Sequence, residues 1–312
     1  MKFSITIPAY KRNYLKEALD SVLAQTYADF EIIIVNDASP EDLDSIISSY
    51  SDSRIHYYKN EQNCGAINVV DNWNKCLEYA SGDYIICMGD DDKLLPCCLE
   101  EYYKLIVKYP GLGVYHGWTE IIDEQSCFSS ITQHRCEYES VYSLIWHRWE
   151  NRHCQFIGDF CFNTIQLKNN GGFYKLPLAW GSDDITAVMA ASTKGIANTP
   201  TVVFQYRQNR YTISKSGNER VKVMAIQHER KWYEHFLGTE PSDSLEKKYW
   251  LSILGLMPRH FKEKMKLMVI DDMTHSLLPA ISYWHKNRAM LQFTLKDWVI
   301  VIIKTLKRKM FS

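Results

Sequence analysis

Apolar and polar positions in the first 110 residues follow two alternating patterns. Four short apolar runs, typical of buried strands, occupy residues 3–7, 31–35, 55–58 and 84–87. The segments between these runs are predicted to be helices over residues 13–25, 41–50 and about 66–80. Strands that alternate with helices predict a parallel sheet with right-handed crossovers. Pro8 is expected to end the first strand.

The rest of the chain is patterned less clearly. Residues 113–118 and 196–206 read as strands, and residues 185–191 as a helix. Residues 125–150 are polar and aromatic and allow no assignment. From about residue 218 onward the pattern is helical, with charged residues throughout. The fold class is therefore α/β, with a helical extension at the C-terminal end.

Polar side chains follow three of the predicted strands at the point where each strand ends. Pro8–Tyr10 follow the first strand, Asn36–Asp37 the second and Asp90–Asp92 the fourth. Ligands of parallel sheets bind outside the carboxyl ends of the strands, so these groups are expected to lie together. The first strand-to-helix turn has no G-x-G-x-x-G, which disfavours an NAD-type fold.

The acidic run Asp90–Asp92 is the strongest candidate for chemistry. Three adjacent carboxylates at the mouth of a sheet favour a divalent cation such as Mg²⁺ or Mn²⁺, whose coordination phosphate oxygens normally complete. The run therefore predicts a metal–diphosphate site. The alternative is an acidic turn before the helix that Pro96 opens.

Composition excludes several classes of protein. The 312 residues carry a net charge of −1, which disfavours binding of nucleic acid through a basic surface. None of the nine cysteines forms a C-x-x-C pair, so neither a zinc ribbon nor a redox motif is indicated, and a reducing cytosol fits. No secretory signal is recognised, and no run approaches the ~18 apolar residues of a membrane span. We therefore expect a cytoplasmic protein.

The final segment, residues 295–311, combines an apolar body, Trp298 and a cationic tail. A basic amphipathic helix of this kind can lie in the interface of an anionic membrane. That interpretation would place the protein peripherally on the inner face of the cell membrane. The alternative is a helix that packs on the domain with a solvated tail. Homo-oligomerisation is left open.

The motifs of the first 110 residues resemble those of family 2 glycosyltransferases, the GT-A-fold enzymes that build bacterial polysaccharides. The matching segments, in family order and spacing, are ITIPAYKR (5–12), LDSVLAQTY (19–27), FEIIIVNDAS (30–39), NCG (63–65), ASGDYI (80–85), and the acidic pair at 91–92 before Leu95-Pro96. The match is looser over residues 171–214 and is not recognised beyond about residue 220. The resemblance implies a GT-A domain over residues 1–217, with a nucleotide-sugar-binding half (1–110) and an acceptor-side half (111–217), followed by a helical region (218–312).

The resemblance implies roles for residues in these segments. Tyr10 would stack on the nucleotide base and Asp37 would accept a hydrogen bond from the uracil imide. The acidic run corresponds to the DxD region, in which Asp91 and Asp92 would hold Mn²⁺ or Mg²⁺ on the diphosphate and Asp90 would lie near the ribose or a phosphate. The implied nucleotide-binding residues are Pro8, Ala9, Tyr10, Arg12, Asp37, Asn63, Asp90, Asp91 and Arg207.

The sequence departs from the family pattern within the acidic run. Many relatives have an acid where Gly89 stands, so the metal pair is either Asp90 with Asp92 or Asp91 with Asp92. The distance to Pro96 favours the second pair.

A second departure lies further along the chain. Many relatives have a histidine where Asn209 stands, so the resemblance implies no third protein ligand from that segment. Arg207 or Arg210 would contact the diphosphate, in a segment that includes Ser214 and closes over the donor phosphates.

Asp183 and Asp184 resemble the acidic pair that supplies the catalytic base, and family position favours Asp184. The resemblance implies inverting transfer of a sugar from a UDP donor to a hydroxyl of a glycan or lipid-linked acceptor in cell-surface polysaccharide synthesis. One alternative is a nucleotidyltransferase, which the lack of a Gly-rich basic loop after the first strand disfavours. Another is an inactive sugar- or nucleotide-binding scaffold, which Gly89 and Asn209 keep open.

Four of these side chains also have ordinary structural interpretations. Asp37 could cap the helix at 41–50, and Asp183 could be no more than a helix N-cap. Tyr10 could be a core aromatic, and Arg207 could be a surface ion-pair partner.

Overall fold

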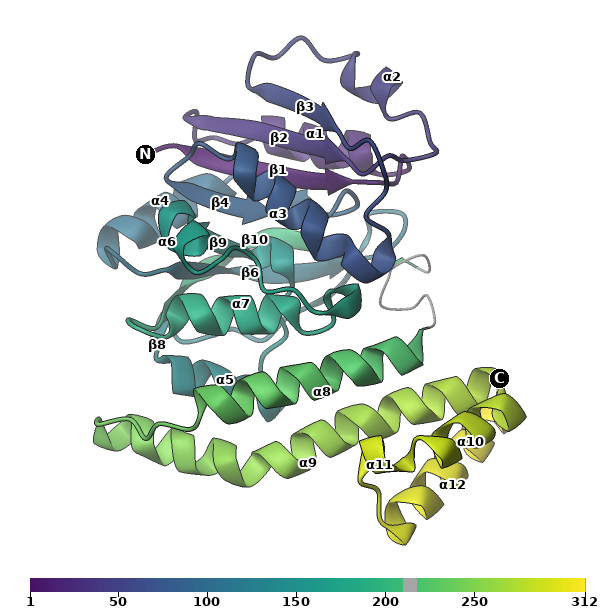
Figure 1. Cartoon of the computed structure of the whole chain (residues 1–312). Coiled ribbons are helices and arrows are strands. Elements are labelled where there is room, and N and C mark those ends of the chain that lie inside the picture. Colours follow the sequence, from purple (N-terminus) through teal and green to yellow (C-terminus); the bar gives the residue numbers. More distant parts are fainter. Residues whose placement is uncertain (210–217, 312) are drawn as a thin grey trace. The chain divides into compact units, whose positions relative to one another are not determined.

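The computed structural model describes residues 1–209 and 218–311 (Figure 1). Arg210 and Ser214, which were predicted to lie near the diphosphate, fall outside the described residues. The chain forms two compact units, Met1–Lys175 with Ser182–Arg210 and Leu176–Gly181 with Tyr211–Ser312. The catalytic and helical domains implied by the resemblance, divided at 217/218, stay a prediction.

The first half of the larger unit alternates strands and helices as the sequence predicts. Its elements are β1 (Phe3–Ala9), α1 (Leu15–Leu23), β2 (Phe30–Asn36), α2 (Asp44–Ile47), β3 (Ile55–Lys59), η1 (Ala66–Asn68), α3 (Val69–Tyr79), β4 (Tyr84–Cys87), β5 (Lys93–Leu94) and α4 (Cys98–Lys108). All residues of β2 and β4 are buried, because helices cover both faces of these strands.

The second half of this unit includes the region that no sequence pattern resolved. Its elements are β6 (Val114–Ile122), β7 (Phe128–Ile131), β8 (Tyr138–Glu139), α5 (Val141–Trp149), η2 (Ile157–Asp159), β9 (Phe160–Asn163), α6 (Thr164–Asn169), α7 (Ser182–Ala191) and β10 (Ile196–Arg207). Strand β7 is exposed at every position and β8 has two residues, so neither leaves an alternating pattern in the sequence.

The strands form one mixed sheet in the order β3-β2-β1-β4-β9-β6-β10-β5. Strands β3, β2, β1 and β4 are parallel, and β9 is antiparallel to both of its neighbours. Strand β1 pairs with β2 on one side and with β4 on the other, so the strand order reverses at β1. Right-handed crossovers then place α1 and α3 on opposite faces, as Figure 1 shows. The space between the ends of β1 and β4 is a topological switch point, where ligands of such sheets bind.

Strand β1 continues through Pro8 to Ala9, two residues further than expected. The carbonyl of Thr6 accepts the amide of Met88, and the carbonyl of Ala9 accepts the amide of Asp37. Pro8, two residues after Thr6, therefore faces the β4 side, beyond the last β4 residue in the ladder. Its missing N–H has no strand partner there, so the proline does not interrupt the sheet.

A buried carboxylate fastens the opposite end of the central strands. Glu31 on β2 accepts hydrogen bonds from Lys2 Nζ (2.5 Å), Ser4 Oγ (2.6 Å) and the Ser81 amide (2.8 Å). Burial opposes ionisation, but these donors outweigh it and lower the pKa of Glu31 to about 2. The carboxylate thus ties β1, β2 and the turn before β4 together.

The smaller unit is helical, as predicted. Its elements are η3 (Pro177–Ala179), α8 (Glu219–Phe236), α9 (Ser244–His275), α10 (Leu277–Lys286), α11 (Arg288–Leu291) and α12 (Leu295–Phe311). Helix α9 is capped by Asp243, whose carboxylate accepts the amides of Leu245 and Glu246. Within the described ranges, no helix is both long enough and apolar enough to cross a membrane.

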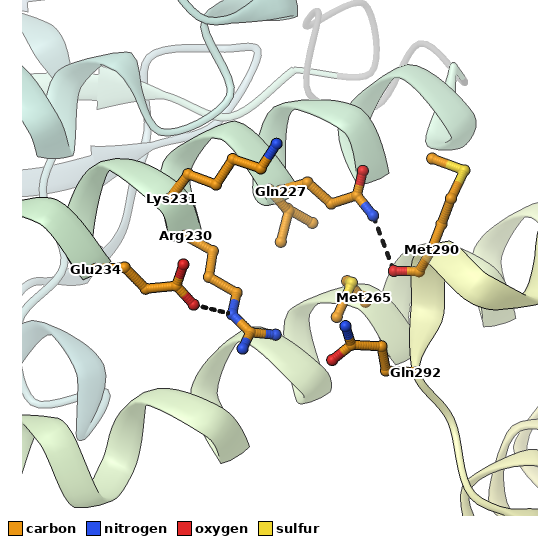
Figure 2. Close-up of a pocket in the computed structure, with 8 residues that line it drawn as sticks. Gln227, Arg230, Lys231, Glu234, Met265, Met290 and Gln292 are labelled. Atoms are coloured by element: carbon orange, nitrogen blue, oxygen red, sulfur yellow. Dashed lines mark hydrogen bonds and ion pairs between the residues drawn. The ribbon is translucent and has the colours of Figure 1, made fainter.

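A pocket of about 240 Å³ lies among the helices of this unit (Figure 2). Its residues come from α8, α9, α11 and the residue after α11: Ile226, Gln227, Arg230, Lys231, Glu234, Met265, Met290 and Gln292. Arg230 Nε donates to Glu234, and Gln227 Nε2 donates to the Met290 carbonyl. None of the residues predicted for nucleotide binding or catalysis lines this pocket.

Candidate active site

The loops that follow β1 and β4 meet at the switch point. Asp90 Oδ2 accepts the backbone amides of Tyr10 and Lys11, each at 2.7 Å. Burial and the neighbouring Asp91 raise the pKa of Asp90 to about 6, although these two amides oppose the rise. In this structure Asp90 joins the two loops, and its predicted contact with the ribose or a phosphate stays a prediction.

Gly89 leaves a space that two carboxylates share. Asp91 Oδ1 and Asp92 Oδ2 each lie 2.9 Å from the position that a Cβ atom at residue 89 would occupy. The two oxygens are therefore no more than twice that distance apart and face the same small volume. Any side chain at residue 89 would occupy this volume.

The remaining oxygens of this carboxylate pair are held by β10 and the residues after it. Asn209 Nδ2 donates to Asp91 Oδ2 at 2.6 Å, and the Arg207 amide donates to Asp92 Oδ1 at 2.9 Å. Burial, followed by the charge of Asp91, raises the pKa of Asp92 well above its usual value. Two like charges this close together, with Asp92 buried and Asp91 partly buried, are stabilised by a cation, so the donor set fits Mg²⁺ or Mn²⁺. This placement supports Asp91 with Asp92, rather than Asp90 with Asp92, as the metal pair.

Arg207 is neither on the surface nor aimed at open solvent, because its side chain is fully buried. Nε donates to the Asp91 carbonyl (2.7 Å) and Nη2 to Glu17 (2.9 Å). Nη1 donates to the Asp123 carbonyl (3.1 Å) and to Ser126 Oγ (2.9 Å). The guanidinium therefore fastens the acidic run to α1 and to the turn after β6. Its predicted contact with the diphosphate stays a prediction that these protein contacts disfavour.

Asp37 follows β2 at the same edge of the sheet. Its carboxylate accepts Asn60 Nδ2 (2.7 Å) and the Cys64 amide (3.0 Å), whereas α2 begins at Asp44 after a different residue. Asp37 therefore does not cap α2. The contacts anchor the 60–65 loop, which includes Asn63, beside the end of β2.

The other predicted nucleotide-binding residues differ in accessibility. Pro8 and Ala9 end β1, and Ala9 is fully buried. Tyr10 is 41% exposed, so it is not a core aromatic and its ring is accessible for stacking. Arg12 is exposed, with its amide on Glu41 Oε2 at 2.5 Å.

The acidic pair at the start of α7 divides into two environments. Asp184 is buried and accepts Arg148 Nε (2.9 Å), Arg148 Nη2 (3.3 Å) and Gln155 Nε2 (2.6 Å). Asp183 Oδ1 accepts the Asp184 amide (2.9 Å), and the side chain is only partly buried. Burial and the charge of Asp184 raise the pKa of Asp183 to about 7. These contacts favour Asp183 over Asp184 as the proton acceptor, and which of the two acids is the base stays a prediction.

Tyr206 is influenced electrostatically by both acidic groups. Its ring stacks on Phe156 with centroids 3.7 Å apart. Burial raises the pKa of its phenol, and the charges of Asp92, Asp91 and Asp183 raise it further. The carboxylates that follow β4 and the carboxylate at the start of α7 thus act on the pKa of the same side chain.

Sequence reasoning missed several residues that support this site. Arg148 and Gln155 come from the region around α5 that showed no pattern, and Asn60 and Glu17 belong to no motif. Their roles depend on partners 23 to 190 residues away in the chain, which no local pattern shows.

A second group of potential metal ligands also escaped prediction. Glu139, His147 and His153 each place one ligand atom within 4.8 Å of the others. Burial lowers the pKa of His153 to about 3, so its ring is neutral. The Glu139 carboxylate lies 3.5 Å from His147 Nδ1 and accepts Ser143 Oγ at 3.1 Å.

The fold and the site define the class of the protein. A mixed, mainly parallel sheet with helices on both faces and a carboxylate pair at its switch point is the GT-A type of nucleotide-sugar-binding fold. The chain belongs to glycosyl transferase family 2, because the model of the family described as "Glycosyl transferase family 2" matches residues 4–166, more than half of its length. The resemblance of the sequence motifs to this family is confirmed.

Curated relatives are similar over the first part of the chain. An uncharacterized glycosyltransferase of Rickettsia typhi is 36% identical over 126 residues, 39% of this chain and 38% of that protein. Glycosyltransferase GlyA of Streptococcus pneumoniae is 34% identical over 186 residues, 58% of this chain and 24% of that protein. The UDP-Glc:alpha-D-GlcNAc-diphosphoundecaprenol beta-1,3-glucosyltransferase WfgD of Escherichia coli is 32% identical over 124 residues, 39% of this chain and 47% of that protein. The chain thus spans less than half the length of each of these relatives.

Solved structures resemble almost the whole chain. S. aureus TarS 1-349 in complex with UDP-GlcNAc has a TM-score of 0.61 at 16% identity, covering 96% of this chain and 90% of that one. Mannosyltransferase PcManGT from Pyrobaculum calidifontis, in complex with GDP-Man and Mn2+, has a TM-score of 0.54 at 16% identity, covering 99% of this chain and 86% of that one. At 16% identity, these likenesses show that the chain shares the fold of the two proteins.

Proposed function

We propose that this protein transfers a sugar from a UDP donor to a hydroxyl group in a reaction that depends on a divalent metal ion and inverts the anomeric configuration. The observation that carries the proposal is the convergence of Asp91 Oδ1 and Asp92 Oδ2 over Gly89 at the switch point. Two solved structures of the same fold, one in complex with UDP-GlcNAc and the other with GDP-Man and Mn2+, support a nucleotide-sugar donor.

Asp91 and Asp92 would hold Mn²⁺ or Mg²⁺ through the two oxygens that face each other. When bound, the ion supplies a Lewis acid that stabilises the leaving diphosphate. The protein fixes these carboxylates through Asn209 Nδ2 and the Arg207 amide, so that little reorganisation is needed when the ion binds. The uracil base would bind at the 60–65 loop that Asp37 anchors, with the exposed ring of Tyr10 available for stacking.

Asp183 is proposed as the general base, and Asp184 as its neighbour that forms an ion pair with Arg148. A carboxyl with a pKa of about 7 is balanced between accepting and releasing a proton near neutral pH, which suits a base that removes the proton of an attacking hydroxyl. A single displacement assisted by one base inverts the anomeric carbon. The acceptor hydroxyl would enter beside Tyr206, which responds to the charges of both acidic groups.

The acceptor is proposed to be a glycan or a lipid-linked sugar in cell-surface polysaccharide synthesis. Support comes from the name of the relative WfgD, which specifies a diphosphoundecaprenol-linked acceptor. The proposed location is the cytoplasmic side of the cell membrane, where nucleotide sugars and such acceptors would meet.

The nucleotide site is tested by thermal unfolding of the full chain with UDP or GDP, each with MnCl₂ or with EDTA. We expect UDP with Mn²⁺ to raise the melting temperature, because a ligand that binds the folded state stabilises it. Asp92→Asn should abolish the shift, since the amide cannot ligate the ion as a carboxylate does. The control Asp71→Asn, on an exposed ion pair with Lys175, should retain it.

Three outcomes would contradict parts of the proposal. A shift that survives EDTA would remove the metal requirement. A larger shift with GDP would replace UDP as the donor nucleotide. Full metal-dependent binding by Asp92→Asn would show that the ion is held elsewhere.

A further inference from the structure

Helix α12 presents an apolar stripe that is not covered by the rest of its unit. The stripe consists of Leu295, Val299, Ile302, Ile303, Leu306 and Met310, which are 45% to 86% exposed. At 3.6 residues per turn, these positions fall within an arc of about 100° along the whole helix. Six large apolar side chains in one line form a continuous patch of the kind that marks an interaction surface.

The opposite side of α12 is fastened to α9, which fixes the direction of the stripe. Asp297 pairs with Lys266 (2.6 Å) and with Lys262 (3.3 Å) on α9. About one turn after Asp297 the fully buried Val301 makes a further attachment, and about three turns after it the Arg308–Asp271 ion pair makes another. These contacts fix the rotation of α12 about its own axis, so the stripe cannot turn inward while they hold.

The charges beside the stripe have one sign. Asp297 is the single acidic residue of α12, and it faces α9. Lys296 and Lys307 flank the stripe on one side and Lys309 on the other, with Lys304 further round. Among the parts of the chain that the structure describes, these four lysines form no ion pair, and all are exposed.

This combination distinguishes between two occupants of the stripe. A second copy of the chain, packed stripe to stripe, would bring the lysine rows of the two helices together and repel. An anionic lipid surface accepts both features at once: the apolar stripe enters the acyl boundary while the lysines meet the headgroups. A helix of about 25 Å with the stripe along its full length would lie in the plane of the interface.

We propose that the exposed face of α12 docks the protein on an anionic phospholipid membrane. The proposal is independent of the nucleotide site, because every residue that carries it belongs to α12 or α9. Its consequence would be that the protein works where lipid-linked molecules are held.

The test is flotation of the full chain with vesicles of phosphatidylcholine, alone or with about 30% phosphatidylglycerol, at low salt and at about 0.5 M salt. We expect partition onto the anionic vesicles to exceed that onto neutral ones by at least about tenfold and to fall with salt. The variant Val299→Ser/Ile303→Ser/Leu306→Ser should lose at least about tenfold in partition. Lys296→Gln/Lys307→Gln, at the two lysines that flank the stripe on one side, should lose roughly thirtyfold on anionic vesicles only.

The matched control is Val107→Ser/Ile165→Ser, which removes two equally exposed apolar side chains from α4 and α6. It should partition as the wild type does. Melting temperature and UDP binding without vesicles are measured for every variant, so that unfolding or failure of the nucleotide site is recognised separately.

Two results would overturn the proposal. Equal partition of the wild type and the triple serine variant would show that the stripe does not enter the bilayer. The second result is a wild type that does not bind vesicles and sediments as a dimer, while the triple serine variant is monomeric. That result would show that the stripe binds a second copy of the chain.

Discussion

Replacing Asp183 or Asp184 singly by asparagine is expected to have different effects on catalysis. Asp184 accepts three hydrogen bonds from Arg148 and Gln155, which occupy its oxygens and leave it little capacity to accept a substrate proton. Asp183 carries a pKa of about 7, raised by burial and by the charge of Asp184. The base should therefore be Asp183.

Asp183→Asn is expected to lower kcat by about 10²–10⁴-fold, the usual contribution of a positioned base, and to leave the KM for the donor little changed. The pH profile of kcat/KM should also change. In the wild type it should rise through about pH 7 as Asp183 loses its proton, and in the variant this limb should disappear.

Asp184→Asn should keep the base but alter its environment. Removing the neighbouring negative charge lowers the pKa of Asp183, so the acid limb of the profile should move to lower pH. Arg148 would lose its carboxylate partner, which should reduce the free energy of unfolding by on the order of 1–3 kcal/mol. The Arg148 side chain is 31% exposed, which keeps this loss below that of a fully buried pair.

The assay is release of UDP from whichever UDP-sugar raises the melting temperature most, between about pH 5 and pH 9, with urea unfolding in parallel. Asp71→Asn is the control and should behave as the wild type in both measurements. The reasoning is refuted if Asp184→Asn abolishes turnover in a folded protein while Asp183→Asn keeps its activity and its acid limb.

Three further predictions concern the metal pair, the sheet and the buried arginine. Gly89→Ala should weaken Mn²⁺-dependent UDP binding at least about tenfold by calorimetry, because its methyl group would lie 2.9 Å from both facing carboxylate oxygens. Gly255→Ala, with no atom within 4 Å of the new methyl, is the control. Equal affinity of the two variants would show that metal binding does not need the space between Asp91 and Asp92. Glu31→Gln should reduce the free energy of unfolding by about 2 kcal/mol at pH 7. This difference between variant and wild type should shrink as pH falls from about 4.5 toward 2. The reason is that the lowered pKa of Glu31 stabilises the fold only while the carboxylate is ionised. Urea unfolding measures this, and an equal difference at pH 7 and at about pH 3 would show another cause. Arg207→Met should reduce the free energy of unfolding by on the order of 3 kcal/mol and also weaken Mn²⁺-dependent UDP binding, because the guanidinium holds the Asp91 carbonyl. A variant with unchanged stability would contradict the structural role of this arginine.

Local sequence pattern predicted the half of the fold that positions the site. The apolar runs and amphipathic stretches of the first 110 residues became strands and helices within a few residues of their expected bounds. Parallel strands place their carboxyl ends at one edge, so Tyr10, Asp37 and Asp90 had to meet there whatever the details of packing. In the acceptor-side half, the strands expected at 113–118 and 196–206 and the helix at 185–191 also formed. Residues 125–150 were not readable, because β7 is exposed at every position and β8 has only two residues.

The role of each acid at the site could not be predicted in the same way. Asp90, Asp91 and Asp92 are adjacent in the sequence, yet one binds backbone amides of the β1 loop and the other two face each other over Gly89. The difference arises from the turn of the backbone between Gly89 and Asp92 and from donors supplied by β10. Sequence spacing favoured Asp91 with Asp92 as the metal pair, and the turn conformation supports the same pair, which stays a prediction.

The sequence by itself determined the order of strands and helices, the edge of the sheet that carries the polar groups, and membership of glycosyl transferase family 2. These properties follow from periodicity and from motifs of adjacent residues, which are local. Only the tertiary structure decided what Asp183 and Asp184 are each hydrogen-bonded to, what Arg207 binds and which face of α12 is exposed. A carboxylate's pKa and a helix's orientation depend on groups far away in the chain, such as the Arg148 guanidinium 36 residues before Asp184. Those groups come together only when the chain has folded.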